Sequence, residues 1–122
     1  MLNRLLWLSF GFLLLVPIHL RAQYQTIELE KVQLARSLDA EVFDPAGSPI
    51  SVALVEELSS EWKEMLRTTK TDPTGKFSFA PVKGRDVYYL QIRMDGFDPL
   101  RIRLKIDPKK GKNLRLKLKV AT

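Results

Sequence analysis

The side chains of this 122-residue chain that could do chemistry are carboxylates, hydroxyls, amines and guanidiniums, because it has no cysteine and its one histidine is His19. Residues 23–122 therefore lack the Ser/His and Cys/His pairs of nucleophilic catalysis and the thiolate and imidazole ligands typical of zinc sites. An enzyme would have to work with Asp, Glu, Ser, Thr, Tyr and Lys alone. We predict that the protein is not an enzyme and has no catalytic residue, cofactor or metal ligand.

The polar cluster TDPTGKFSF, residues 71–79, has two interpretations. As a site, Asp72 would bind Ca²⁺ or act as an acid, but the further carboxylates that a hard cation requires are missing nearby. As a turn, Asp72 accepts a hydrogen bond from the amide two residues on, and Gly75 takes a positive φ. Phe77 and Phe79 then point to one face of the following strand. We favour the turn.

Four glutamates stand close together in EELSSEWKE, residues 56–64. A carboxylate pair does acid–base chemistry when an apolar pocket shifts one of the two pKa values. The segment is polar, and no apolar pocket is visible around it. We therefore expect Glu56, Glu57, Glu61 and Glu64 to be solvated.

The C-terminal part of the chain is strongly basic. Residues 99–122 contain nine Lys or Arg and one Asp, whereas residues 23–98 contain nine basic and thirteen acidic residues. Basic and aliphatic residues alternate in the last two predicted strands, so a hairpin of the two would have one apolar and one basic face. Pairing of residue 105 with 115 would set like charges opposite each other, at about 0.2–1 kcal/mol per pair. The basic face comprises Arg101, Arg103, Lys105, Arg115, Lys117 and Lys119.

Two interpretations of the basic face stay open. Acidic side chains that alternate on earlier strands, Glu28 and Glu30 or Asp39 and Glu41, could flank and neutralise it. Alternatively, it binds an anion such as an acidic polysaccharide or the headgroup of a phospholipid or lipopolysaccharide. Nucleic acid fits poorly, because the segment has no interleaved aromatic residues for stacking.

Three aromatic residues outside the predicted turns are also candidates for the core or for a surface site. Trp62 either stacks on a sugar ring or caps the core at the start of a strand. Tyr88 and Tyr89 point to opposite faces of one strand. We expect Tyr88 to be buried, with its hydroxyl reaching a loop carbonyl, and Tyr89 to be partly exposed.

The N-terminus, residues 1–22, predicts a secretory signal peptide. After Arg4, residues 5–20 contain no ionised side chain. A helix of this length spans about 24 Å, less than the roughly 30 Å of a bilayer core. We predict cleavage after Ala22, with a retained anchor as the alternative. The mature protein would be periplasmic or extracellular, with an envelope protein or anionic polysaccharide as partner and membrane contact only through the uncleaved leader.

The elements that position these side chains follow from alternation and turn signals. Residues 23–36 are predicted to be a lead-in segment or edge strand, and residues 37–122 to form one domain. Turns recur roughly every ten residues, which favours a seven-stranded antiparallel β-sandwich. The predicted strands are residues 38–42, 50–55, 63–70, 77–79, 88–93, 100–106 and 114–120.

Three motifs carry a resemblance to a known family. AEVFDPAGSPISVALV has the pattern D-x-x-G-x-P-I, TDPTGKFSF has T-D-x-x-G-x-F-x-F, and YYLQIRMDGF has Y-x-L-x-V-x-x-x-G-[FY] with Ile92 at the Val position. With these motifs the chain resembles the carboxypeptidase regulatory-like domains, which are transthyretin-like or prealbumin-like sandwiches. One departure is Val52, where such domains often have Gly. The resemblance implies a Greek-key sandwich and an exported, non-catalytic module for binding or structural support at the cell envelope, and it adds no active residues.

Overall fold

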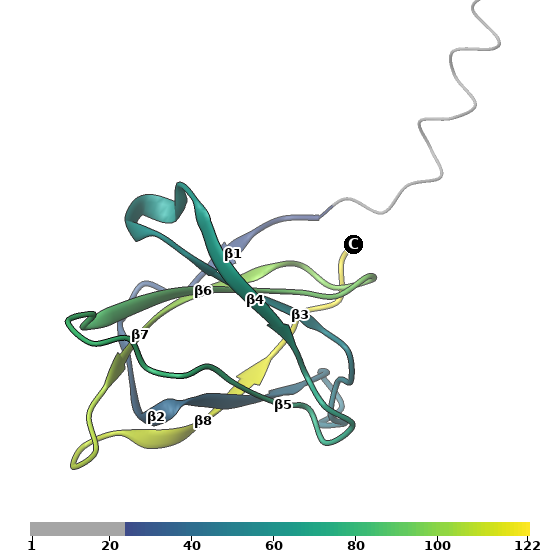
Figure 1. Cartoon of the computed structure of the whole chain (residues 1–122). Coiled ribbons are helices and arrows are strands. Elements are labelled where there is room, and N and C mark those ends of the chain that lie inside the picture. The colour runs from purple at the N-terminus through teal and green to yellow at the C-terminus, as the bar shows by residue number, and fades with distance from the viewer. Residues whose placement is uncertain (1–23) are drawn as a thin grey trace, which may run out of the picture.

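Alternating apolar and polar residues form eight β-strands in the computed structural model, which describes residues 24–122 (Figure 1). A short 3₁₀ turn, η2 (Ser60–Trp62), precedes the fourth strand. No helix in this part of the chain has the length and apolar character needed to cross a membrane. The strands are β1 (Ile27–Glu28), β2 (Gln33–Phe43), β3 (Leu54–Leu58), β4 (Met65–Lys70), β5 (Lys76–Ser78), β6 (Val87–Arg93), β7 (Leu100–Ile106) and β8 (Lys112–Lys117).

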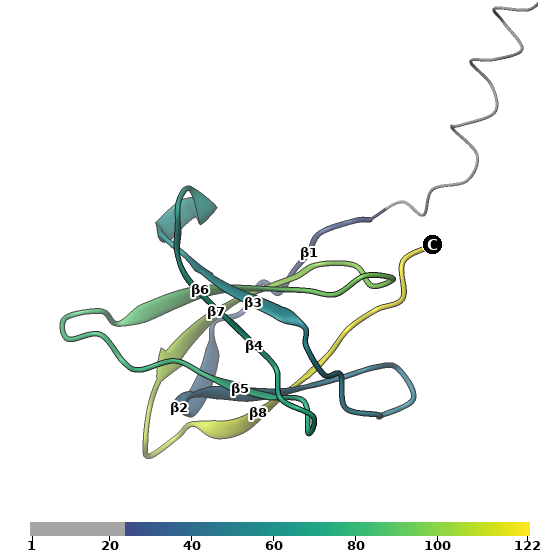
Figure 2. The same cartoon turned by 45° about the vertical axis from the view of Figure 1, so that its right-hand side comes forward.

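The strands form the two layers of a sandwich, with β4, β3, β6 and β7 in one layer and β5, β2 and β8 in the other (Figures 1 and 2). Strand β2 connects the layers, because residues 33–35 pair with β7 whereas residues 39–43 pair with β5 or β8. Strand β1 pairs with the start of β7. Strands β4 and β5 stand at the two ends of the strand order. They do not pair with each other, so the sheet is not closed.

The all-β sandwich is confirmed, but the predicted strand number and directions are corrected. The eighth strand is β1, which lies in the segment predicted as a lead-in or edge strand. Three pairings, β1 with β7, β2 with β7 and β2 with β8, are parallel rather than antiparallel. Alternation tells which face a side chain takes, but it does not tell which strand lies alongside or in which direction.

The core consists of the inward-facing residues of both layers. Tyr88 is 1 % exposed, as predicted, and its hydroxyl accepts a hydrogen bond from the Val82 amide at 2.9 Å. The core and the side chains packed on it lie between Ile27 and Leu118. The core residues are Ala35, Leu38, Ala40, Val42, Ile50, Ala53, Val55, Phe77, Tyr88, Leu90, Ile92, Leu100, Ile102, Leu104, Leu116 and Leu118.

The strand predicted at residues 50–55 begins only at Leu54, because residues 50–53 form a turn that is pinned by Thr71. The buried Thr71 hydroxyl donates to the Ile50 carbonyl at 2.7 Å and accepts from the Ala53 amide at 2.8 Å. Between them, Val52 donates its amide to the Thr71 carbonyl and adopts φ 55°. The turn thus holds a β-branched residue in the left-handed region, which glycine adopts more readily.

Replacing Val52 with glycine is expected to stabilise the domain. The left-handed conformation costs an L-residue roughly 1–2 kcal/mol, and glycine removes this cost while adding entropy to the unfolded chain. Little packing is lost, because Val52 is 60 % exposed. We expect the free energy of unfolding in urea to rise by about 0.5–1 kcal/mol. Val52→Ala retains the Cβ and is the control, and a glycine variant no more stable than the alanine variant would contradict this explanation.

Candidate functional site

A hydrogen-bonded row of side chains crosses the outer face of the first layer. Glu56 on β3, Gln91 on β6 and Arg101 on β7 are direct register partners. The Gln91 amide donates to Glu56 Oε1 at 3.0 Å, and its oxygen accepts from Arg101 Nε at 2.7 Å. Each group therefore fixes the orientation of the next. We call the outward-facing side chains of β3, β6 and β7, with the residues packed on them, the outer face.

The carboxylate of this row is buried, contrary to the prediction that it is solvated. Glu56 is 7 % exposed, and Arg93 binds both of its oxygens, Nε to Oε1 at 2.8 Å and Nη2 to Oε2 at 3.2 Å. This two-point contact is the geometry in which arginine binds carboxylates most strongly. Glu56 therefore anchors the outer face. By contrast, Glu61 and Glu64 are exposed, as predicted.

An aromatic pair lies at one end of the row. Trp62 packs edge-to-face on Tyr89 with ring centroids 5.1 Å apart, and the Arg101 guanidinium carbon lies 4.8 Å from the Trp62 ring centroid. Trp62 is half-buried and outside the core, so the prediction that it caps the core is wrong. It instead joins Tyr89 and Arg101 in an aromatic and cationic platform. Whether that platform stacks on a sugar ring stays a prediction.

The backbone under Trp62 is strained. Glu61 and Trp62 have φ values of 62° and 59°, so two consecutive residues with side chains lie in the left-handed region. Each costs roughly 1–2 kcal/mol. Contacts to Tyr89 and Arg101 must offset this cost, because the peptide would otherwise relax. The position of this aromatic side chain on the outer face therefore comes at a cost in folding free energy.

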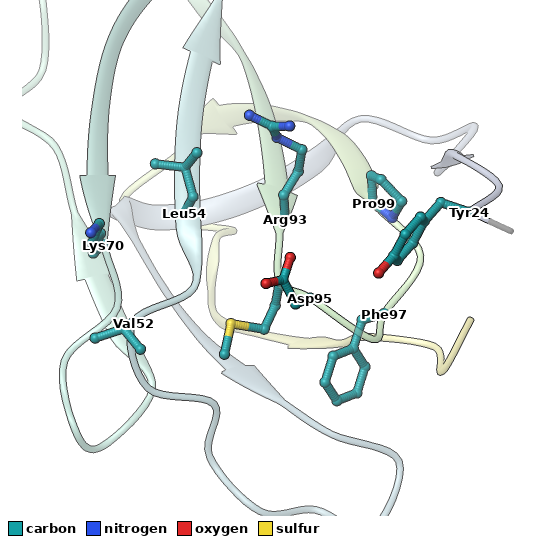
Figure 3. A pocket seen from close by; sticks show the side chains of 9 residues that line it. Tyr24, Val52, Leu54, Lys70, Arg93, Asp95, Phe97 and Pro99 are labelled. Carbon is teal, nitrogen blue, oxygen red and sulfur yellow. The ribbon is translucent and has the colours of Figure 1, made fainter. Parts of the chain in front are cut away.

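A pocket of about 540 Å³ lies at the other end of the outer face (Figure 3). Its floor is a second cross-strand row, Lys70 on β4, Leu54 on β3 and Arg93 on β6. The lead-in segment closes one side, since the Tyr24 hydroxyl accepts from the Gly96 amide at 3.1 Å and Asp98 accepts from the Gln25 amide. The remaining lining residues are Val52, Met94, Asp95, Phe97 and Pro99.

The six basic residues of the predicted hairpin do not form one face. Strand β8 pairs with β2, not with β7, and sets Arg115 opposite Glu41 and Lys117 opposite Phe43. The residues of β7 and β8 therefore point outward from opposite layers. The predicted hairpin is wrong because the chain changes layer at the turn between these strands. In this turn Gly111 packs against the backbone of Ala35, and β8 continues alongside β2.

The basic side chains of β7 are largely engaged on the outer face. Arg101 bonds Gln91, Arg103 donates to the Glu30 carbonyl, and Lys105 lies 3.6 Å from Asp86. Glu28 is the register partner of Arg101. Glu28 and Glu30 therefore lie beside the basic residues of β7, as one of the two interpretations predicted. Glu30, however, contacts Arg103 through its backbone carbonyl and not through its carboxylate.

The basic side chains of β8 and the residues after it are exposed. Arg115 lies opposite Glu41 and 4.3 Å above the Phe43 ring centroid. Lys117 and Lys119 make no ion pair with any residue from 24 to 122. Asp39, the other predicted acidic neighbour, pairs with Ser78 on β5 instead. The uncompensated charge therefore lies at the end of β8.

The structure also contains a buried ionic cluster that the sequence interpretation missed. Glu57, predicted to be solvated, is fully buried and accepts from Arg67 Nε at 2.6 Å and Arg85 Nη1 at 2.5 Å. The two guanidiniums lie over the rings of Phe79 and Tyr88. Continuing the alternation of buried positions from Ala53 and Val55 would have placed Glu57 inward.

The turn at Asp72 is confirmed. Asp72 Oδ1 accepts from the Thr74 amide, the Thr74 hydroxyl and the Lys76 amide, and Gly75 has φ 81°. These hydrogen bonds, led by that of the Thr74 hydroxyl, lower the pKa of Asp72. In the turn between β7 and β8, the pKa of Asp107 is lowered chiefly by the hydrogen bond from the Lys110 amide. Across residues 24–122 no three acidic or His/Cys side chains gather as a metal site would require.

Comparison with known proteins agrees with the motif resemblance. No curated protein matches the chain. The family model of the carboxypeptidase regulatory-like domain matches residues 37–119, which is nearly the whole segment that forms the two layers. The chain belongs to the carboxypeptidase regulatory-like domain family.

Proposed function

We propose that this β-sandwich is an exported, non-catalytic module that binds another component of the cell envelope through its outer face. The observation that carries the proposal is the strained placement of Trp62 against Tyr89 and Arg101. Strained backbone persists where neighbouring contacts over-determine it, and such positions cluster at binding sites. Trp, Tyr and Arg are also the residue types that dominate binding energy at interfaces.

The arrangement of the outer face suits binding without large reorganisation. The row from Glu56 through Gln91 to Arg101 is held by hydrogen bonds before any partner arrives. A preorganised surface loses less side-chain entropy on binding. The pocket beside Arg93 adds a concave, partly apolar site at the far end of the same face. A partner could therefore contact the platform and insert a group into the pocket together.

The roles of the carboxylates support a module without catalysis. Glu56 and Glu57 are adjacent on β3, so they point to opposite faces. Each is already paired with arginine, through both of its oxygens. Neither is arranged as half of an acid–base pair. The proposal of export rests on the apolar leader, residues 1–22, which lies outside the described residues.

Replacing Trp62 with alanine is expected to weaken binding of residues 23–122 to cell-envelope fractions by about tenfold or more, as loss of a hot-spot aromatic does. Binding is measured by cosedimentation at fixed salt. Val82→Ala, which truncates an exposed apolar residue in the loop between β5 and β6, is the control and should bind as the unchanged domain does. Equal binding by the Trp62 variant and the control would contradict the assignment of the outer face.

A second candidate function is recognition of an anionic glycan or membrane surface by the basic residues. The observation favouring it is the exposed, unpaired charge of Lys117 and Lys119. Because the two basic groups lie on opposite layers, Arg103→Glu and Lys117→Glu test them separately. If β8 binds the anion, Lys117→Glu should abolish the salt-sensitive part of envelope binding and Arg103→Glu should leave it. Salt-sensitive binding that persists unchanged in the Lys117→Glu variant would exclude this candidate.

A further inference from the structure

One edge of strand β8 is open. Within residues 24–122, β8 pairs with β2 alone and no other strand covers its second edge. The edge ends near Lys119, whose carbonyl accepts from the Asp98 amide as the chain crosses to the other layer. The strand itself contains neither proline nor glycine. It is therefore a continuous extended template of the kind that pairs with an added strand.

The backbone groups at this edge follow from the known pairing with β2. The Leu118 amide donates to the Phe43 carbonyl at 2.8 Å, so the amides and carbonyls of even-numbered residues point toward β2. Those of Asn113, Arg115 and Lys117 point away from it. The side chains of these same residues lie on the outer surface of the second layer, whereas Leu114 and Leu116 face the core.

The charges at the edge select what can pair there. A second copy of β8 would bring Arg115 and Lys117 beside the same cations of its partner, so self-pairing is disfavoured. A strand with acidic side chains opposite Arg115 and Lys117 would neutralise both. Its alternate side chains would point toward Leu114 and Leu116, and aliphatic residues would extend the core there.

We propose that β8 is a docking edge for an extended segment of a partner protein in which acidic and aliphatic residues alternate. The segment adds as a fourth strand to the layer β5, β2 and β8. Backbone hydrogen bonds provide the pairing, and Arg115 and Lys117 provide the selectivity for acidic side chains. This edge lies in the layer opposite the outer face, so the inference is independent of the function proposed above.

The test uses residues 23–122 and a capped seven-residue peptide that alternates glutamate with valine, with affinity measured by calorimetry at low salt. A second peptide of the same sequence carries N-methyl groups on alternate residues, which keep the charge but block backbone pairing along one edge. Two such peptides are made, one methylated on the odd-numbered and one on the even-numbered residues, because either set of amides could face β8. The protein variants are Lys117→Glu and, as a charge-matched control in an exposed loop, Lys83→Glu.

We expect the unmethylated peptide to bind, Lys117→Glu to weaken its binding by about fivefold, and Lys83→Glu to leave it unchanged. At least one methylated peptide should fail to bind. A basic peptide that alternates lysine with valine should bind Lys117→Glu better than it binds the unchanged domain. If both methylated peptides bind as well as the parent, the contact is charge attraction without strand addition and the proposal is wrong. Absence of binding by the parent peptide also overturns it.

Discussion

Replacing Gly111 with alanine is expected to lower the free energy of unfolding by about 4 kcal/mol or more, which places the variant among the most damaging single substitutions. A Cβ at this position would lie 2.3 Å from the Ala35 carbonyl carbon and 2.4 Å from the carbonyl oxygens of Ala35 and Asp107. All three atoms belong to the backbone, so no side chain can move aside. The turn would have to move away from β2, and the pairing of β8 with β2 would be lost.

The measurement for Gly111 is a urea unfolding curve of residues 23–122, followed by circular dichroism. The control is Gly84→Ala, because a Cβ there meets nothing within 4 Å and only the positive φ of 83° resists it. We expect that control to cost about 1 kcal/mol. If the Gly111 variant were as stable as the Gly84 variant, the close packing of this turn on β2 would be wrong.

Replacing Glu57 with glutamine is expected to destabilise the domain by about 2–3 kcal/mol. Removing one partner of a buried ion pair typically costs about 3–5 kcal/mol because the other charge stays uncompensated. The lower figure is appropriate here because the Arg67 and Arg85 side chains are 28 % and 32 % exposed, so water partly screens their charges. Glutamine keeps the size of the side chain, so the loss reports charge rather than packing.

Glu56→Gln is the matched control for Glu57→Gln, because it makes the same change one residue earlier on the opposite face of β3. The Arg93 side chain that binds Glu56 is 50 % exposed, so its charge is better solvated when the carboxylate is lost. We therefore expect a smaller cost, about 1 kcal/mol. A Glu57 variant that unfolds at the same urea concentration as the Glu56 variant would show that burial does not strengthen the Glu57 cluster.

The turns and the buried faces could be predicted from local sequence, because their causes are local. Asp72 and Gly75 form their turn with groups a few residues away. Tyr88, Leu90 and Ile92 alternate on one strand and are all buried. These features depend on the two-residue period of a strand and on side chains that bond their own backbone, both of which are visible in a short window.

Strand neighbours could not be predicted in the same way. The basic residues of β7 and β8 have the alternation of a hairpin, but the partner of β8 is decided by the contact of Gly111 with Ala35, 76 positions earlier in the chain. Local alternation from Ala53 and Val55 does place Glu57 inward, but the groups that compensate its charge could not be predicted. Its burial is compensated by Arg67 and Arg85, which come from a neighbouring strand and a distant loop.

The candidate site was only partly visible in the sequence. Trp62 stood out as an isolated aromatic residue, but its partners Tyr89 and Arg101 come from two strands that meet it only in the fold. The left-handed backbone beneath it has no sequence signal, because glycine is absent there. The pocket combines residues from four separate parts of the chain, including Tyr24 of the lead-in segment.

The most direct test of the outer face as the binding surface is hydroxyl-radical footprinting of residues 23–122, with and without the envelope fraction that cosediments with them. Trp62 is the only tryptophan in this part of the chain, so its oxidation is assigned without ambiguity by mass spectrometry. Phe43, under Arg115 on the opposite layer, is the internal reference. We predict that binding protects Trp62 and Tyr89 and leaves Phe43 unchanged. Protection of Phe43 with Trp62 still fully oxidised would contradict the account.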